Sequence, residues 1–362
     1  MTITFLLPRT AEHPIGGFKI IYQYGNQLAK KGATVNYVYG VACRKDLKSF
    51  VKIGYQVCRY FRFLKYKFFI DWRPEKWIKT TGKSFHYLTY SLSENVLPES
   101  DVVIASSWVT ALWLDGFVKV PNTKKFYLIQ AFENWHGGDK KVIETWKMPL
   151  NKIVISPWLL DIAHKLGEKA VLIENGFNLK DFFVERPIAS RDPYSIMMLW
   201  HDNPVKGCEL GLNACKKLKE EYPDIRLIMF GVPERPSDFP EWIEYHHQPS
   251  KSQLRGLYND ASIFIGTSYS EGWGLTLGEA MLCGCAVACT DNGGYLAMAN
   301  HQETALVSHV GDMEALKSHI ELLITNDELR TTIAENAAEF VKKYDFTIQA
   351  EKFASTILSD SI

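Results

Sequence analysis

The sequence lacks several features that mark common classes of protein. Its 362 residues contain no apolar run of about 18, the length that a membrane-spanning helix needs. The first residues show neither the basic start nor the long apolar stretch of a signal peptide, so we expect a cytoplasmic protein. Lys plus Arg and Asp plus Glu number 41 each, which argues against a dedicated nucleic-acid-binding protein. No Gly-x-Gly-x-x-Gly follows a predicted strand, which disfavours a dehydrogenase.

Metal-binding patterns are missing as well. Cys283, Cys285 and Cys289 cluster, but no Cys-x-x-Cys pair or accompanying histidine set resembles a zinc site. The adjacent His246 and His247 would point to opposite faces of a strand, which disfavours a shared metal. We therefore expect reduced thiols and no metal site.

What the sequence does contain is an alternation of short apolar strands and amphipathic helices, which predicts α/β domains with parallel sheets. The predicted strands are residues 3–7, 34–39, 101–106, 125–130, 153–156 and 171–174, then 194–199, 225–230, 263–266, 286–290 and 305–307. Glycines, prolines and charges interrupt the pattern between residues 175 and 193. We therefore expect two doubly wound Rossmann-like domains, 1–176 and 177–345, and a helical chain from residue 312 to the end.

The segment 270–281 carries most of the functional information. It follows an apolar strand, contains Gly272 and Gly274, and opens a helix, with Glu271 and Glu279 on either side of the turn. A strand, a glycine turn and a helix N-terminus together make an anion site, because backbone N–H groups and the helix dipole both favour negative charge. The carboxylates add acceptors for sugar hydroxyls, so the segment predicts a nucleotide-sugar site. The alternative is an ordinary strand-loop-helix unit with two surface glutamates.

The spacing of Glu271 and Glu279, with Gly-Trp-Gly-Leu after the first acid and Ala-Met after the second, resembles the retaining GT-B glycosyltransferases of family 4. In that family the first acid contacts the donor sugar and the second holds the ribose. The resemblance implies the same roles here, and it implies that the turn between the acids meets the sugar and diphosphate. The residues of that turn are Gly272, Trp273, Gly274, Leu275 and Thr276.

Three further positions match the family to different degrees. Gly16 and Gly17 open the helix predicted over 18–31, where the resemblance implies contact with the donor diphosphate; a tight turn alone would also explain them. Lys206 matches the family's phosphate-binding lysine. His201 stands where the family has an arginine, and either its imidazolium supplies the missing charge or the side chain only packs the loop.

Gln130 ends a predicted strand near the position where the family commonly has a histidine close to the sugar. We assign Gln130 to the catalytic set with Glu271 and Lys206. Gln130 and the nearby Glu133 are equally compatible with binding hydroxyls and with simply ending a strand, and His136 is a weaker candidate.

A further match lies in the second domain. Gln248 and Pro249 resemble the loop that meets the nucleobase, a contact made by main-chain groups. Their side chains therefore say little about which base is bound.

The segment 55–79 interleaves basic and aromatic side chains. One interpretation is a helical insertion with a buried aromatic stripe and a solvated basic face. The other is an element drawn to anionic lipid, or a wall for a lipid-linked acceptor, at the inner membrane surface. Its members are Arg59, Tyr60, Phe61, Arg62, Phe63, Lys65, Tyr66, Lys67, Phe68, Phe69, Trp72, Arg73, Lys76, Trp77 and Lys79.

Taken together, the resemblance implies the GT-B fold, with an acceptor-side first domain, a nucleotide-sugar-binding second domain and a cleft between them. The last helix, 346–362, would dock back on the first domain through an apolar face that includes Phe353 and Ile357. The resemblance implies a retaining transfer of a hexosyl unit, with glucose as first expectation, from a UDP-sugar to a glycan or lipid-linked glycan in polysaccharide biosynthesis.

No Asp-x-Asp occurs, so Lys206, Gly17 and the start of the helix after Gly274 would balance the diphosphate charge without a metal or a cofactor. Two alternatives stay open. One is a sugar-nucleotide 2-epimerase, for which no acid/base residues are evident in the sequence. The other is a non-catalytic GT-B scaffold that binds nucleotide or glycan, which the missing arginine would support.

Overall fold

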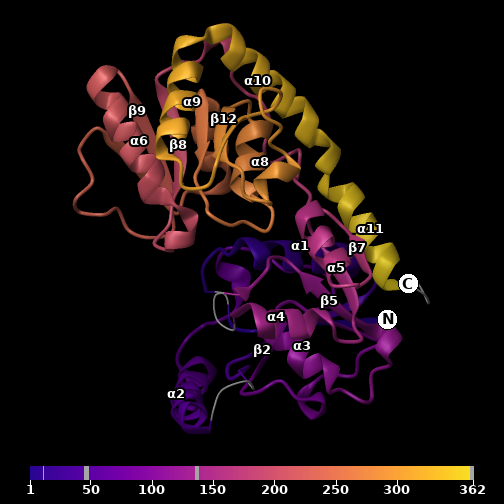
Figure 1. Ribbon diagram of the computed structural model, residues 1–362. Helices are drawn as coiled ribbons and strands as arrows, with labels where there is room; N and C mark the ends of the chain where they lie inside the picture. Colours follow the sequence, from indigo (N-terminus) through magenta and orange to yellow (C-terminus); the bar gives the residue numbers. More distant parts are fainter. Residues whose placement is uncertain (11, 45–48, 135–137, 359–362) are drawn as a thin grey trace. The chain divides into compact units, whose positions relative to one another are not determined.

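The computed structural model describes residues 1–10, 12–44, 49–134 and 138–358, and the chain forms two compact units (Figure 1). Unit 1 comprises Met1–Glu174 together with the chain from Gln349 onward, and unit 2 comprises Asn175–Ile348. The boundary expected from the sequence lies two residues further along the chain. Each unit is built on one parallel sheet, so the prediction of an α/β protein is confirmed.

Unit 1 contains a seven-stranded parallel sheet in the order β3-β2-β1-β4-β5-β6-β7. The central strands are almost completely buried, which explains why they appear in the sequence as apolar runs. The strand order reverses between β1 and β4, and ligands of open α/β sheets bind at such a switch point. The strands are β1 (Thr2–Leu7), β2 (Thr34–Gly40), β3 (Ser84–Thr89), β4 (Val102–Ala105), β5 (Lys125–Ile129), β6 (Asn151–Val154) and β7 (Ala170–Leu172).

Helices connect these strands. They are α1 (Gly16–Lys30), α2 (Ser49–Phe68), α3 (Trp108–Asp115), α4 (Gly138–Trp146) and α5 (Pro157–Lys165). No described helix combines the length and the apolar composition that crossing a bilayer requires.

The last helix, α11 (Phe346–Leu358), contributes to unit 1 from residue 349 onward. The ring of Phe353 is fully buried and stacks on Tyr24, with ring centroids 4.1 Å apart, and on Phe5 at 6.3 Å. A salt bridge of 2.7 Å between Lys31 and Glu351 lies at the edge of this contact. The helix was expected over 346–362; residues 359–362 lie outside the described part of the chain.

Unit 2 contains a six-stranded parallel sheet in the order β10-β9-β8-β11-β12-β13, with its switch point between β8 and β11. Its strands are β8 (Ser195–Trp200), β9 (Arg226–Gly231), β10 (Ile243–His247), β11 (Ile263–Gly266), β12 (Ala286–Thr290) and β13 (Leu306–Ser308). Its helices are α6 (Cys208–Glu221), α7 (Lys251–Asp260), α8 (Leu275–Leu282), α9 (Met313–Thr325) and α10 (Asp327–Phe340). Buried apolar residues of β8, β9, β11, β12, α6 and α9 form a continuous core that fixes these strand ends.

Candidate functional site

The switch point of unit 2 brings together three loops. Each follows a central strand: one after β8, one after β11 and one after β12. Because parallel strands end at the same edge of the sheet, residues that are far apart in sequence become neighbours there. The loop after β8 carries Lys206, and the loop after β11 carries Glu271.

Lys206 and Glu271 form the centre of this site. The Lys206 ammonium lies 2.6 Å from Glu271 Oε1, and the two side chains are 25% and 16% exposed. The hydroxyl of Ser268 donates to the same carboxylate oxygen at 2.8 Å, and Tyr295 OH donates to Ser268 Oγ at 3.2 Å. Burial raises the pKa of Tyr295 well above its ordinary value, so its hydroxyl keeps the proton that this chain of hydrogen bonds needs.

The backbone around Lys206 is held in place by the neighbouring loop. Asn203 caps the short 3-10 turn Pro204–Lys206, and the Lys206 carbonyl accepts from Thr267 Oγ1 at 2.9 Å. Gly207 then has φ 61°, and a Cβ at this position would collide with the Thr267 carbonyl. The Lys-Gly pair therefore serves geometry as well as charge: only glycine allows the loop to approach β11 this closely.

The N-terminus of α8 begins beside Glu271. Gly274 precedes it with φ 102°, and a Cβ there would lie 2.6 Å from the ring of Tyr295. The N-cap residue Gly274 provides no side-chain hydrogen bond to this helix end, and the first turn contains no acidic residue. Leu275 and Thr276 are partly exposed at this first turn, so the helix presents a positive dipole end suited to an anion.

Glu279 lies one turn further along α8 and is 4% exposed. Among the described residues it is the acidic side chain most completely removed from solvent. Burying a carboxylate costs free energy unless it is hydrogen-bonded, so a glutamate buried here requires hydrogen-bond donors. Glu271 thus lies before the glycine turn, and Glu279 lies after it within α8.

The structure describes the surroundings of two further predicted residues of this region, Trp273 and His201. The indole of Trp273 is buried and packs edge-on against Tyr344, with ring centroids 4.9 Å apart, so its side chain belongs to the core. His201 Nδ1 accepts a hydrogen bond from the backbone N–H of Asn203 at 2.9 Å. Desolvation and the nearby Lys206 lower the pKa of His201, while Asp202 and Glu271 raise it. These surroundings favour the neutral imidazole, which fits the alternative in which His201 packs the loop.

The loop after β10 has an unusual backbone. Gln248 has φ 46°, a conformation that non-glycine residues rarely adopt, and its N–H donates to the Gly231 carbonyl at 2.8 Å. Pro249 follows, and Ser250 then caps α7 in a capping box with Gln253. Strain of this kind persists where the surroundings enforce it, which is common at ligand sites.

The loop after β12 contributes residues that we did not predict. A Cβ at Gly294 would lie 2.6 Å from the Glu271 carbonyl, so the two loops touch through their backbones. Asn292 is buried; its Nδ2 donates to the Ser268 carbonyl at 3.0 Å, and its Oδ1 accepts from Tyr295 N–H. The Asn-Gly-Gly sequence at the end of a central strand was the available signal for this support.

A second candidate site lies at the switch point of unit 1. Helix α1 begins at Gly16, two residues before the predicted start, and the N-cap residue Ile15 supplies no side-chain cap. A Cβ on Gly17 would lie 3.2 Å from both polar atoms of the Gln130 amide. Gln130 Oε1 is buried and accepts no hydrogen bond from the described residues, which is uncommon in native proteins. Gly17 and Gln130 thus lie in close contact, and glycine at position 17 leaves room for the Gln130 amide.

Glu133 has a different role from Gln130. Its Oε2 accepts a hydrogen bond of 2.8 Å from the backbone N–H of Trp108, the first residue of α3. Desolvation raises the pKa of Glu133 to about 7, and the bond from Trp108 opposes this shift. Glu133 therefore holds the start of α3 near Gln130. The weaker candidate His136 lies outside the described residues.

The fold and the two switch points define a GT-B protein. The Anabaena protein HepE has a TM-score of 0.71 over 99% of both chains at 15% identity. Sucrose-phosphate synthase from Thermosynechococcus elongatus has 0.69 over 98% of this chain and 97% of its own, at 17% identity. Residues 181–340 match the family model for glycosyl transferases group 1, and this region belongs to that family.

Two curated relatives are similar in sequence. N,N'-diacetylbacillosaminyl-diphospho-undecaprenol alpha-1,3-N-acetylgalactosaminyltransferase of Campylobacter jejuni is 26% identical over 54% of this chain. Phosphatidyl-myo-inositol mannosyltransferase of Mycobacterium leprae is 25% identical over 55%. The chain spans only 56% and 60% of these two relatives' lengths.

Proposed function

We propose that this chain transfers a glycosyl unit from a nucleoside diphosphate sugar to an acceptor hydroxyl with retention of anomeric configuration. The observation that carries the proposal is the Lys206–Glu271 pair beside the N-terminus of α8, with Glu279 buried one turn further on. The family of residues 181–340 supports it. HepE, which shares the fold, was crystallised with UDP and glucose, so UDP-glucose is our first choice of donor.

In this proposal each residue of unit 2 has a defined task. Lys206 and the first-turn amides of α8 balance the charge that develops on the departing diphosphate. Glu271 orients the Lys206 ammonium and accepts from a hydroxyl of the donor sugar. Glu279 accepts from the ribose diol, and the backbone at Gln248 meets the base. No metal ion or cofactor takes part.

The proposed reaction balances without a protein nucleophile. The bond between the anomeric carbon and the β-phosphate oxygen breaks, and its electron pair leaves with the phosphate. The acceptor oxygen then bonds to the anomeric carbon from the same face. Its proton passes to the departing phosphate, so the configuration is retained and the protein ends unchanged.

For unit 1 we propose contacts to polar groups of the substrates. The glycine turn at Gly16 and Gly17 would receive a diphosphate oxygen through main-chain N–H groups. The Gln130 amide would meet a sugar hydroxyl. The names of the two relatives specify lipid acceptors, which supports a glycan or lipid-linked glycan acceptor.

We also propose that α2 contacts an anionic membrane surface from the cytoplasmic side. The expected buried aromatic stripe is wrong for much of this segment: Phe61, Phe68 and Phe69 are 67%, 65% and 83% exposed. Exposed aromatic and basic side chains on one helix suit an anionic interface. The protein should sediment with phosphatidylglycerol vesicles and less with phosphatidylcholine vesicles; equal sedimentation with both would contradict the proposal.

The decisive experiment is a thermal-shift screen of UDP-, TDP- and GDP-sugars, followed by assays of nucleotide release. A ligand at about 100 times its Kd stabilises the protein by about 2.7 kcal/mol. Release of UDP with an acceptor, and a product of unchanged anomeric configuration, is the expected result. Binding without release would indicate the scaffold alternative, and an epimerised nucleotide sugar formed without acceptor would indicate the 2-epimerase.

A matched pair of variants tests the site itself. Lys206→Ala should abolish most UDP release, because the diphosphate loses its cation. Lys217→Ala removes an exposed lysine that pairs with Glu314 on the surface and should leave the rate unchanged.

Addition of a metal chelator should not lower the initial rate of UDP release. A loss restored by Mg²⁺ or Mn²⁺ would overturn the metal-independent mechanism.

A further inference from the structure

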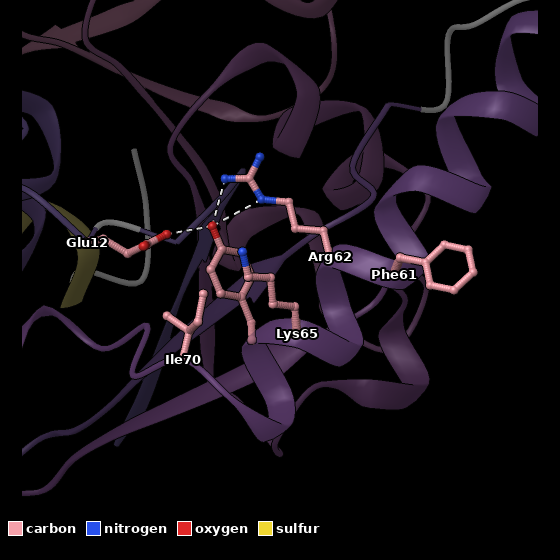
Figure 2. A pocket seen from close by; sticks show the side chains of 6 residues that line it. Glu12, Phe61, Arg62, Lys65 and Ile70 are labelled. Carbon is pink, nitrogen blue, oxygen red and sulfur yellow. Dashed lines mark hydrogen bonds between the residues drawn. The ribbon is translucent and has the colours of Figure 1, made fainter.

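A hollow of about 460 Å³ opens in unit 1. It lies between the C-terminal half of α2 and the loop that follows β1 (Figure 2). Its lining residues are Glu12, Phe61, Arg62, Lys65, Tyr66 and Ile70.

Tyr66 organises the polar side of this hollow. It is 6% exposed, and its hydroxyl donates to Glu12 Oε1 at 2.5 Å. The Tyr66 hydroxyl oxygen in turn accepts from Arg62 Nε at 3.0 Å and from Arg62 Nη2 at 2.7 Å. Figure 2 shows the guanidinium and the carboxylate meeting at this oxygen. Arg62 is therefore held in a fixed orientation rather than free on the surface.

The charge of the hollow is positive. Lys65 lies three residues after Arg62, on the same face of α2. Within the described part of the chain, no carboxylate forms a salt bridge with Arg62 or Lys65; Glu12 reaches Arg62 only through the Tyr66 hydroxyl. Two cations and one carboxylate leave an excess of one positive charge, so the hollow favours an anion.

We propose that this hollow binds the phosphate group of an acceptor that also carries an apolar chain. A guanidinium held by its Nε side keeps N–H groups for a phosphate oxygen, and a nearby ammonium adds a point charge. Phe61 and Ile70 form the apolar part of the lining, and two exposed rings lie just beyond it: Phe68 is the last residue of α2, and Phe69 follows it. This inference rests on the proposed function, because it names the class of acceptor.

The probe is farnesyl phosphate below its micelle concentration, compared with inorganic phosphate and farnesol, by calorimetry on the full chain. The Arg62→Gln/Lys65→Gln variant should weaken farnesyl phosphate binding at least about tenfold, the loss of one charged hydrogen bond or more. The control Arg59→Gln/Lys67→Gln removes the same charge from α2 outside the hollow and should stay within about twofold of wild type.

The outcomes separate the explanations. Equal weakening in both double variants would mean general attraction to a basic helix and overturn the proposal. Inorganic phosphate binding as tightly as farnesyl phosphate would show a free-phosphate site, and farnesol binding as tightly would show an apolar site; either result overturns it. Lys65→Gln alone, which removes no described contact, guards against misfolding and should itself weaken binding. Farnesyl phosphate binding without any nucleotide-sugar binding would refute the proposed function and leave this pocket standing.

Discussion

Glu271 and Glu279 flank one glycine turn, yet their surroundings differ. Glu271 meets Lys206 and Ser268, whereas Glu279 is buried in α8. Glu279→Gln should weaken UDP binding by about 1.5–3 kcal/mol, because a charged acceptor for the ribose is lost.

Glu271→Gln should leave UDP affinity nearly unchanged and depress turnover, since its partner is the sugar. Calorimetry with UDP and a rate assay check both. A collapse of UDP binding in Glu271→Gln would reverse the assigned roles.

Glu133 links stability to pH. Its pKa in the folded protein is about 7, above its ordinary 4.5, so the folded state holds this proton more tightly than the unfolded chain. The resulting stabilisation is fully present below about pH 4.5 and is lost as pH rises through 7. In Glu133→Gln, the neutral side chain still accepts from Trp108. The melting temperature of this variant relative to wild type should therefore increase between these pH values. A difference that stays constant with pH would contradict the assignment.

Single residues differ in how far the sequence reveals them. Lys206 and Glu271 were predicted as parts of one ligand site, because each matches a donor-binding position of the family that the chain resembles. Trp273 was predicted as part of the turn that meets the donor, but the packing of its ring depends on Tyr344, which lies 71 positions later in the chain. The pKa of His201 depends on desolvation in the folded protein and on the nearby Lys206. Neither the packing of Trp273 nor the protonation of His201 can be predicted from the neighbouring residues in the sequence.

At the scale of elements, the start of α8 depends on one glycine. Gly274→Ala would force a Cβ against the Tyr295 ring at φ 102°, so we expect a loss of about 1–3 kcal/mol and of donor binding together. Gly256→Ala is the control. That glycine lies within α7, where an added Cβ would meet nothing within 4 Å, and alanine there should be neutral or stabilising by about 0.5–1 kcal/mol. Chemical denaturation and a thermal shift with UDP measure both effects. An unaffected Gly274→Ala variant would show that the turn tolerates rearrangement.

Most central strands were predicted within two residues, because burial on both faces produces apolar runs. The edge strand β3 was not predicted. Its residues Ser84–Thr89 alternate between partly buried and exposed positions and include His86, so no apolar run marks it. His86 stacks on Tyr37 at 4.8 Å, a contact that only the folded sheet creates. The exposure of the aromatic side chains of α2 could not be predicted either, since composition alone cannot distinguish a buried aromatic stripe from an exposed one.

At the scale of the whole molecule, two units with the same topological reversal follow from one repeated pattern of strands and helices. Each reversal places a glycine turn next to polar side chains: Gly17 with Gln130 in unit 1, and Gly274 with Glu271 in unit 2. The assignment of α11 to unit 1 required the resemblance as well as the apolar face at Phe353 and Ile357, because sequence distance suggests the other unit.

This assignment leads to a prediction about the chain as a whole. Phe353→Ala removes a fully buried ring that stacks on Tyr24 of α1 and on Phe5 of β1, so it should destabilise unit 1 by about 3–5 kcal/mol. Hydrogen exchange should accelerate in α1 and β1 and stay unchanged in α9 of unit 2. Ile348→Ala is the control: this side chain is 52% exposed, and its loss should cost no more than about 0.5 kcal/mol. Equal acceleration in α1 and α9 would show that the two units open as one cooperative body. Acceleration confined to α9 would place the last helix with unit 2 and overturn the assignment, because a stacking partner matters only to the unit whose core it completes.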